Sequence, residues 1–282
     1  MQKRAFVLQT IIISTFESCK KIVQKTKRRV IIFNMHNKLE EVHMYKFFVG
    51  DSQINGNKAT ILNEDVSHIV NVLRLKKEDK IIICSKSTAR SYIAQIEQCS
   101  KEKVECSLIQ EKEETTESFV EIDVYQGLPK MDKMEFIIQK ATEIGARNIY
   151  PVKMERCVVK LNEESTKKKI DRWQKIAEVS AKQSKRDIIP TIKSLTNIKE
   201  ICQNSKKYDI ILLAYENEEK TTIKQELKKL IRNSNLKIAI IVGPEGGMAD
   251  EEVKKLTTCR SKECKSWKKN FKNRNSGISN AK

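Results

Sequence analysis

Between residues 116 and 259 the sequence alternates short apolar runs with longer amphipathic stretches, and this alternation constrains the fold more than any other feature. The predicted strands are Ile122–Gln126, Asn148–Val152, Asp209–Ala214 and Leu236–Val242, and the predicted helices are Met131–Gly145, Glu163–Arg186, Thr221–Ile231 and Asp250–Leu256. The apolar runs are nearly continuous, which is typical of strands buried on both faces of a parallel sheet. The pattern therefore predicts an α/β domain whose helices cover a parallel sheet.

Residues 44–115 show a different pattern, with shorter strands separated by polar turns. The predicted elements are strands at Tyr45–Val49, Ile81–Cys84, Ser91–Ile96 and Lys103–Leu108, a helix between Glu64 and Leu73, and a turn at Asn55–Asn57. The last two strands alternate apolar and polar residues, which indicates one buried face. These residues therefore predict a small β-barrel-like module, and we interpret the acidic stretch Glu111–Glu117 as its linker to the second domain.

The positive charge of the chain is concentrated at its two ends. The 282 residues include 55 Lys and Arg against 37 Asp and Glu, a formal net charge of +18. Residues 1–43 carry +6 and residues 260–282 carry +7, which leaves +5 for the middle. A basic chain favours polyanionic partners such as nucleic acid. Residues 1–43 lack clear periodicity and stop before Met44, a possible alternative start, so we treat them as an N-terminal extension.

Several classes of protein are disfavoured. No stretch approaches the roughly 18 uninterrupted apolar residues of a membrane span. The eight cysteines include no pair at CxxC spacing and there are only three histidines, so we expect no metal site and the reduced thiols of a cytoplasmic protein. The apolar run Ala5–Phe16 lacks a small-residue cleavage site, which argues against an exported protein.

The most informative local feature is the loop Gly243–Gly247, with the sequence Gly-Pro-Glu-Gly-Gly, between a predicted buried strand and a predicted helix. Ligands of open α/β sheets bind beyond the carboxyl ends of the strands, and glycine lets backbone groups approach a ligand closely. A tight turn without a ligand is an equally good explanation of the spacing alone. The acidic first turn of the next helix, Asp250–Glu252, argues against a phosphate at this position.

Two cationic segments are candidates for contacts with a polyanion. The first contains Lys130 and Lys140, and the second is Lys182–Asp187 at the end of the long predicted helix. Each has a simpler explanation, because Lys140 and Glu143 lie one helical turn apart and can pair, and cations at a helix end offset its dipole without any function. Arg156 is ambiguous in the same way.

These segments occur together in a recognisable order. The motifs are Tyr45–Phe48, His68–Arg74, Leu128–Lys130, Gln139–Glu143, Arg172–Trp173, Gln183–Arg186, Ala214–Glu216 and Gly243–Gly247. In this order and spacing, the chain resembles the ribosomal RNA small-subunit methyltransferase E family over about residues 44–259. The resemblance implies a PUA-like RNA-binding β-barrel in residues 44–115 and a SPOUT-type α/β methyltransferase domain in residues 116–259, with a deep trefoil knot that is a rare exception to the rule against threaded chains.

The resemblance also implies a function. A homodimer in the cytoplasm would transfer a methyl group from S-adenosyl-L-methionine to N3 of one uridine in the 16S ribosomal RNA of the small ribosomal subunit. The implied cofactor-binding residues are Leu213, Gly243, Pro244, Glu245, Gly246 and Gly247, and the implied RNA-binding residues are Lys46, Arg74, Lys130, Lys140, Arg156 and Arg186. The sulfonium donor is already activated, so no metal is needed and positioning would supply most of the rate. No residue is identified as the general base.

The resemblance stops after Cys259. The family continues with a short strand and the motif Leu-Gly-x-Arg-Ile-Leu-Arg-x-Glu-Thr-Ala, which closes the knot, whereas residues 260–276 read RSKECKSWKKNFKNRNS and show no strand pattern. Suitable codons for residues 261–275, read one nucleotide later, encode Ala-Lys-Ser-Val-Ser-Leu-Gly-Lys-Arg-Ile-Leu-Arg-Thr-Glu-Thr. We therefore interpret residues 260–282 as an aberrant basic tail produced by two compensating frameshifts, and the sequence of the gene tests this interpretation.

Three functions follow in order of preference. The first is the uridine methyltransferase that the resemblance implies, with activity impaired by the altered tail. The second is a SPOUT-type RNA methyltransferase with another target nucleotide. The third, made plausible by the tail, is a catalytically inactive RNA-binding protein.

Overall fold

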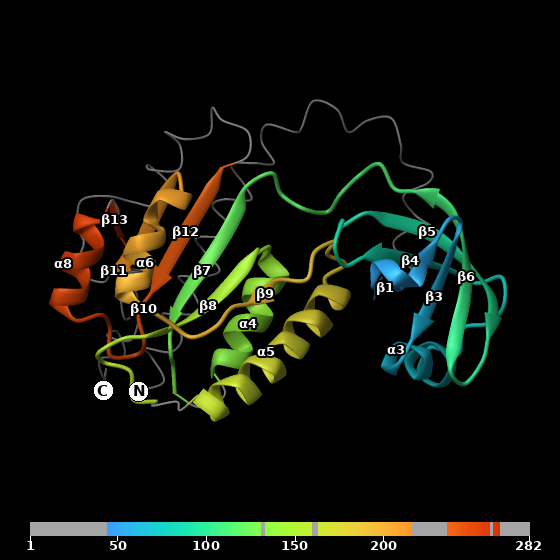
Figure 1. Ribbon diagram of the computed structural model, residues 1–282, viewed down its shortest axis with the longest axis horizontal. Helices are drawn as coiled ribbons and strands as arrows, with labels where there is room; N and C mark the ends of the chain where they lie inside the picture. The colour runs from blue at the N-terminus through green and yellow to red at the C-terminus, as the bar shows by residue number, and fades with distance from the viewer. Residues whose placement is uncertain (1–43, 131–132, 160–162, 216–235, 260–261, 266–282) are drawn as a thin grey trace, which may run out of the picture.

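The computed structural model describes residues 44–130, 133–159, 163–215, 236–259 and 262–265. These residues form two domains, each built on its own β-sheet, and Figure 1 shows the two side by side along the longest axis. The expectations for residues 1–43, for a helix at Thr221–Ile231 and for most of the tail lie outside the described residues. Within the described part, no helix is both long enough and apolar enough to cross a membrane.

The first domain is a six-stranded sheet that bends around one apolar core. Its strands are β1 (Lys46–Val49), β2 (Ile54–Asn55), β3 (Lys58–Leu62), β4 (Lys80–Ser85), β5 (Ser91–Cys99) and β6 (Lys103–Glu111), in the order β1-β4-β5-β6-β3-β2. Strand β1 is parallel to β4 and the other pairs are antiparallel. Strand β1 also lies close to β3 near the far side of the sheet, so the sheet curls into a barrel-like shape around Phe47, Ile61 and Ile83.

Three short helical segments decorate this domain. They are the 3₁₀ turn η1 (Asp51–Gln53), the α-helical turn α3 (Glu64–Ser67) and the π-helical turn η2 (His68–Val72). The single helix that the sequence predicts between Glu64 and Leu73 is therefore divided, because the wider π turn changes the helical phase after Ser67. Val66 and Ile69 remain buried in the core, whereas Val72 is 66% exposed.

The second domain is a seven-stranded sheet in which every pair is parallel. Its strands are β7 (Glu121–Gly127), β8 (Asn148–Lys153), β9 (Thr191–Ile192), β10 (Thr196–Asn197), β11 (Ile210–Tyr215), β12 (Lys237–Val242) and β13 (Lys262–Lys265), in the order β10-β8-β7-β12-β11-β13, with β9 paired to β8. Its helices are α4 (Lys133–Ile144), α5 (Glu163–Gln183), α6 (Ile198–Asn204), η3 (Ser205–Lys207) and α8 (Asp250–Thr258). The α/β class and the parallel sheet are thereby confirmed.

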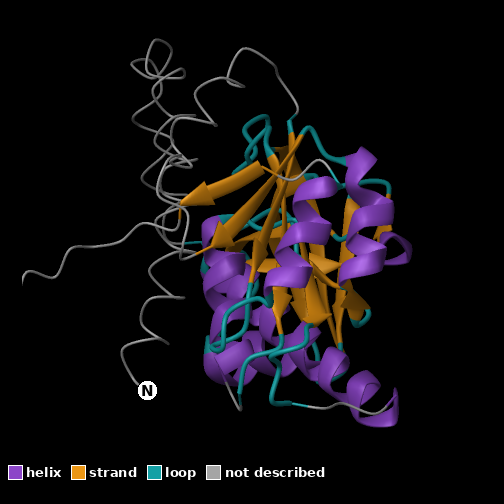
Figure 2. Ribbon diagram, turned by 90° about the vertical axis from the view of Figure 1, so that its left-hand side faces the viewer, coloured by secondary structure: helices purple, strands orange, loops and turns teal. Residues whose placement is uncertain are grey.

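Helices cover both faces of this sheet, as Figure 2 shows, and this explains the nearly continuous apolar runs. In β12, Ile238 and Ile240 pack in the core beneath α4 and α5, whereas Ala239 and Ile241 pack in the core beneath α6 and α8. Successive strand side chains point to opposite faces, so both sets must be apolar. Full burial of each isoleucine contributes about 1.5–3 kcal/mol.

Strand β13 corrects one expectation from the sequence. Residues 262–265 pair in parallel with β11, with Leu213 opposite Glu263 and Ala214 opposite Cys264. A strand therefore forms inside the segment that shows no strand pattern. The hydrogen bonds of a β ladder join backbone groups, so the free edge of β11 accepts a strand whose side chains do not favour one.

Candidate functional site

The carboxyl ends of four adjacent parallel strands, β7, β12, β11 and β13, define one edge of the second sheet. The register places Gln126 opposite Val242, Val242 opposite Ala214, and Ala214 opposite Cys264. The loop Gly243–Gly247, called the glycine loop below, leaves β12 at this edge between the ends of β7 and β11. This is the position at which open α/β sheets bind ligands.

Gly127 allows the glycine loop to pass close to the end of β7. An ideal Cβ atom on Gly127 would lie 2.7 Å from both the Cδ and the backbone N of Pro244, and 2.9 Å from the Sδ of Met154. These distances are too short for any side chain. The loop turns through Gly247, whose φ of +73° favours glycine and whose amide donates to the carbonyl of Pro244 over 2.9 Å.

Gln126 is a buried residue of this edge that sequence reasoning misses. Its Nε2 donates to the carbonyl oxygens of Gly127, at 2.9 Å, and of Gly243, at 3.2 Å. The side chain is fully buried, and its Oε1 has no hydrogen-bond partner among the described residues. Gln126 therefore ties the first residue of the glycine loop to β7. A lone glutamine in a strand carries no signal for this contact, because Gly243 lies 117 residues away in the sequence.

Glu245 attaches the glycine loop to the start of α4. Its Oε1 accepts hydrogen bonds from the Nζ of Lys133, at 2.9 Å, and from the backbone amide of Lys130, at 3.1 Å. Burial alone would raise the pKa of Glu245, but these hydrogen bonds outweigh it and the pKa is lowered. The carboxylate is therefore ionised and already bonded, which makes it a support of the loop and a poor general base.

Arg156 and Lys130 lie beside the glycine loop, as the cationic motifs suggest. Arg156 is exposed and donates from Nη1 to the carbonyl of Gly246 over 3.3 Å. Lys130 is exposed and uses its backbone amide for Glu245. The structure thus brings together the loop and two of the predicted RNA-binding residues, from segments that are far apart in the sequence.

Two other predicted RNA-binding residues lie elsewhere. Lys140 is half-buried on α4, bonds to Glu143 at 2.8 Å and lies 5.6 Å from the ring centroid of Phe136, so the pairing inferred from helical spacing is present. Arg74 is exposed on the first domain directly after η2, with a φ of +55°.

Lys46 and Arg186 require a correction, because the structure does not offer either side chain to RNA. The Nζ of Lys46 pairs with Asp187, and both side chains are 2% exposed. Arg186 is 6% exposed and pairs with Glu117. Both cations are buried between the domains and are neutralised by carboxylates, so they serve the protein interior.

Leu213 and Cys157 also have structural surroundings. Leu213 is fully buried in the core beneath α6 and α8, so its side chain supports the end of β11 and does not face the ligand edge. Burial raises the pKa of the Cys157 thiol, whose sulfur accepts from the amide of Met154 at 3.4 Å. The thiol therefore stays protonated and is a poor nucleophile.

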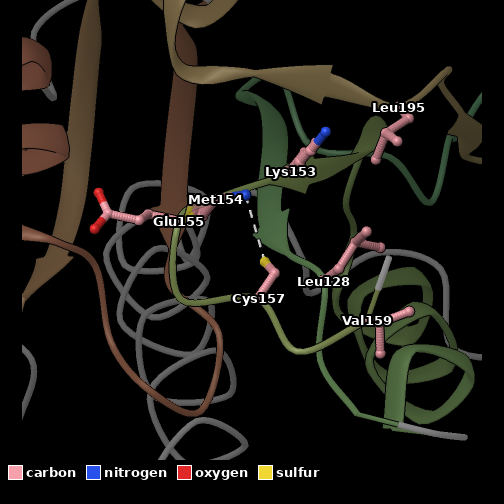
Figure 3. A pocket seen from close by; sticks show the side chains of 7 residues that line it. All are labelled: Leu128, Lys153, Met154, Glu155, Cys157, Val159 and Leu195. Atoms are coloured by element: carbon pink, nitrogen blue, oxygen red, sulfur yellow. Dashed lines mark hydrogen bonds between the residues drawn. The ribbon is translucent and has the colours of Figure 1, made fainter. Parts of the chain in front are cut away.

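A cavity of about 440 Å³ lies at the ends of β7 and β8. Its lining residues are Leu128, Lys153, Met154, Glu155, Cys157, Val159 and Leu195. Figure 3 shows Leu128, Val159 and Leu195 around Cys157, while Glu155 points away to the other side. The walls are mainly apolar and Lys153 supplies a cation. No group of three or more metal-ligating side chains is found in the part of the chain that the structure describes.

Two family models match the chain. Residues 61–109 match an RNA methyltransferase PUA domain, and residues 116–265 match an RNA methyltransferase domain. The two matches fall on the two sheets described above. They confirm a PUA-like barrel followed by a methyltransferase domain.

Individual relatives point to the same family. Over 202 residues, which are 70% of this chain and 78% of the relative, the sequence is 37% identical to ribosomal RNA small subunit methyltransferase E of Bacillus subtilis (strain 168). A protein of the same name from Buchnera aphidicola is 30% identical over 207 residues, 73% of this chain and 79% of the relative. The crystal structure of a ribosomal RNA small subunit methyltransferase E from Neisseria gonorrhoeae, bound to S-adenosyl methionine, shares the fold, with a TM-score of 0.68 at 24% identity over 79% of this chain and 89% of that one. On this evidence, the chain belongs to the ribosomal RNA small subunit methyltransferase E family and is a SPOUT-type RNA methyltransferase by lineage.

Proposed function

We propose that the chain transfers a methyl group from S-adenosyl-L-methionine to N3 of one uridine in 16S ribosomal RNA. The observation that carries the proposal is the glycine loop at the carboxyl edge of the parallel sheet, with Lys130 and Arg156 beside it. Family membership supports RNA as the substrate class. The choice of uridine and of its N3 atom rests on the resemblance of the motifs.

The described residues of this edge fit a nucleoside cofactor. Gly243 and Pro244 are buried while Gly246 is exposed, so the loop presents backbone groups with no side chain in front of them. Gly247 completes the turn, and Leu213 supports the neighbouring strand from below. When bound there, the cofactor supplies an activated methyl group, so the reaction needs no metal.

The RNA would be held by cations on both domains. Arg74 on the barrel and Lys130, Lys153 and Arg156 near the glycine loop are exposed and suited to phosphate contacts. Lys140 contributes a further phosphate contact at the edge of α4. The cavity beside Cys157 receives the unpaired base, because enzymes that modify a base must take it out of the stack.

The protein's share of the chemistry is positioning and electrostatics. The uridine N3 must lose its proton and lie in line with the methyl group, which is an orientation requirement. Lys130 and Arg156 stabilise the negative charge that develops on the base. Glu245 takes no part in proton transfer, because its carboxylate is held by Lys133 and by the amide of Lys130.

Three further features belong to this proposal. The enzyme is a homodimer, its methyltransferase domain contains a trefoil knot, and it works in the cytoplasm where ribosomal subunits are assembled. The boundary between the two domains lies at residues 115–116. The altered side chains after Lys265 weaken cofactor binding, because the pocket's last wall is built there in the family.

Mass mapping of 16S ribosomal RNA tests the function. Small ribosomal subunits that lack the modification are incubated with the chain and S-adenosyl-L-methionine, and a second chain carrying the shifted-frame peptide at residues 261–275 serves as the matched control. Methylation at N3 of one uridine is expected, slowly with the first chain and faster with the second. Methylation of another nucleotide contradicts the target, and RNA binding without methylation by either chain indicates an inactive RNA-binding protein.

A further inference from the structure

The segment Lys185–Asp187, which follows α5, touches the barrel, the interdomain linker and the methyltransferase domain at once; we call it the interdomain segment. Figure 1 shows α5 running from the second domain toward the first, so its end is the point where the chain meets the barrel. The contact includes an apolar part, in which Phe48 and Cys84 of the barrel pack on Ala181 of α5. Its polar part is more specific.

Asp187 is bonded by three separate segments of the chain. From the barrel, Lys46 Nζ and Ser91 Oγ both donate to its Oδ1. From the linker, Thr115 Oγ1 and the amide and hydroxyl of Thr116 donate to its Oδ2, at 3.1, 2.6 and 2.8 Å. Both carboxylate oxygens are therefore saturated inside the protein, at a side chain that is 2% exposed.

The neighbours of Asp187 extend these contacts in both directions. The carbonyl of Lys185 accepts a second hydrogen bond from Lys46 at 3.1 Å, and the carbonyl of Asp187 accepts one from Cys84 Sγ at 3.0 Å. Arg186 points the other way, and its Nη1 donates to the carbonyls of Thr142 and Ala146 at the end of α4, at 3.2 and 2.6 Å. One short segment thus fixes the barrel at one side and α4 at the other.

Helix α4 then continues to the functional site. Its first residue, Lys133, donates to Glu245 of the glycine loop at 2.9 Å, 112 residues further along the chain. The C-terminal end of α4 is held by Arg186, and its N-terminal end holds the glycine loop. The barrel, the interdomain segment, α4 and the glycine loop therefore form one continuous set of packed contacts.

We propose that Lys46, Arg186 and Asp187 are positioning residues that set the orientation of the barrel to the glycine loop. RNA bound on the barrel then presents its acceptor nucleotide at the site. This inference rests on the proposed function. Ion pairs with directed hydrogen bonds fix one docking geometry, whereas an apolar contact alone permits sliding. Such a role explains why cations in two RNA-associated motifs are buried and paired.

Two variants and one control test the inference. Lys46→Met removes the cation, and Lys46→Met/Asp187→Asn removes both charges while leaving no unpaired buried charge if the single variant does not fold. The control is Lys182→Met, which breaks a second ion pair between the domains, with Asp65 at 2.7 Å, that lies nearer the solvent. All chains are compared at a temperature where circular dichroism shows each to be fully folded.

The first readout is the distance between fluorophores on the barrel, at Lys101, and on the second domain, at Lys206, both exposed positions. We expect one narrow distribution for the unaltered chain and for Lys182→Met, and a distribution at least twice as broad for the Lys46 variants. The second readout is steady-state methyl transfer to unmodified small ribosomal subunits. We expect kcat to fall tenfold or more in the Lys46 variants, with KM and the affinity for S-adenosyl-L-methionine within threefold.

A purely structural role predicts a different pattern. In that case a fully folded Lys46 variant keeps its kcat, and this result overturns the inference, as does an unchanged distance distribution. If the unaltered chain and its shifted-frame counterpart both fail to methylate, the proposed function is wrong. The distance distributions then still decide whether the interdomain segment sets the orientation of the barrel.

Discussion

Replacing Gly127 with alanine is expected to push the glycine loop away from the end of β7. The new Cβ atom would lie 2.7 Å from the Cδ and the backbone N of Pro244. This is about 0.7 Å inside the 3.4 Å at which ordinary contact begins, against a ring and a backbone atom that cannot rotate away. The Sδ of Met154, at 2.9 Å, closes the other side.

The size of the effect follows from two opposing terms. Overpacking of this kind costs about 1–3 kcal/mol. The φ of Gly127 is not positive, so alanine also reduces the entropy of the unfolded chain and recovers about 0.4–1 kcal/mol. The clash wins, and the net loss of roughly 0.5–2 kcal/mol lowers Tm by about 2–6 °C for a protein of this size. Loop displacement also weakens binding of S-adenosyl-L-methionine about tenfold.

Thermal unfolding and calorimetric titration measure the two effects, the titration in the chain with the shifted-frame peptide. Gly50→Ala is the matched control, because its φ is −72° and its nearest neighbour is the flexible Oε1 of Gln53 at 3.3 Å. The control should keep the Tm or raise it slightly and leave binding unchanged. If Gly127→Ala melts and binds like the unaltered chain, the steric argument for the glycine loop is wrong.

Three further predictions address charge and the tail. Hydrogen bonds from Lys46, Ser91 and Thr116 outweigh the effect of burial and lower the pKa of Asp187 from 3.8 to about 2, so Asp187 contributes about 2 kcal/mol of stability above pH 4 that is lost as the pH falls toward 2; urea unfolding between pH 5 and pH 2.5 should show this slope, and Asp187→Asn should remove it. Lys133→Met should raise the pKa of Glu245, detectable by NMR titration, and weaken cofactor binding by about threefold to tenfold, because one charge-assisted bond of about 1.5–3 kcal/mol is lost and the amide of Lys130 retains part of the contact. Installing the shifted-frame peptide at residues 261–275 should increase the affinity for S-adenosyl-L-methionine at least tenfold by calorimetry, and equal affinities would contradict the frameshift interpretation.

Periodicity predicts the helices and strands well where one face of an element is buried. The predicted apolar face of α4 contains Met134, Ile138 and Ala141, and all three are buried. In α5, Trp173 and Ala177 are buried as the spacing predicts. These predictions depend only on neighbours within one element, which the sequence lists in order. The position of the glycine loop followed in the same way, because it is set by the strand before it.

Predictions about the role of a charged side chain fail where its partner is distant in sequence. Lys46 and Arg186 have the composition of RNA-binding residues, but Asp187 lies 141 residues from Lys46, and Glu117 lies 69 residues from Arg186. No local pattern distinguishes a buried, paired cation from an exposed one. Lys140 shows the converse, since its partner Glu143 is three residues away and the pairing was readable from the helix.

Strand β13 separates what a backbone needs from what a site needs. Lys262–Lys265 pairs with β11 although its side chains are not those of the family, because a ladder is built from N–H and C=O groups that every residue but proline has. A ligand pocket, in contrast, depends on side chains of the right size and polarity at each position. A change of reading frame can therefore preserve this strand and still alter the wall that follows it. The chain and its shifted-frame counterpart should accordingly differ little in Tm but clearly in cofactor affinity, and a large difference in Tm would show that the strand itself requires the family's side chains.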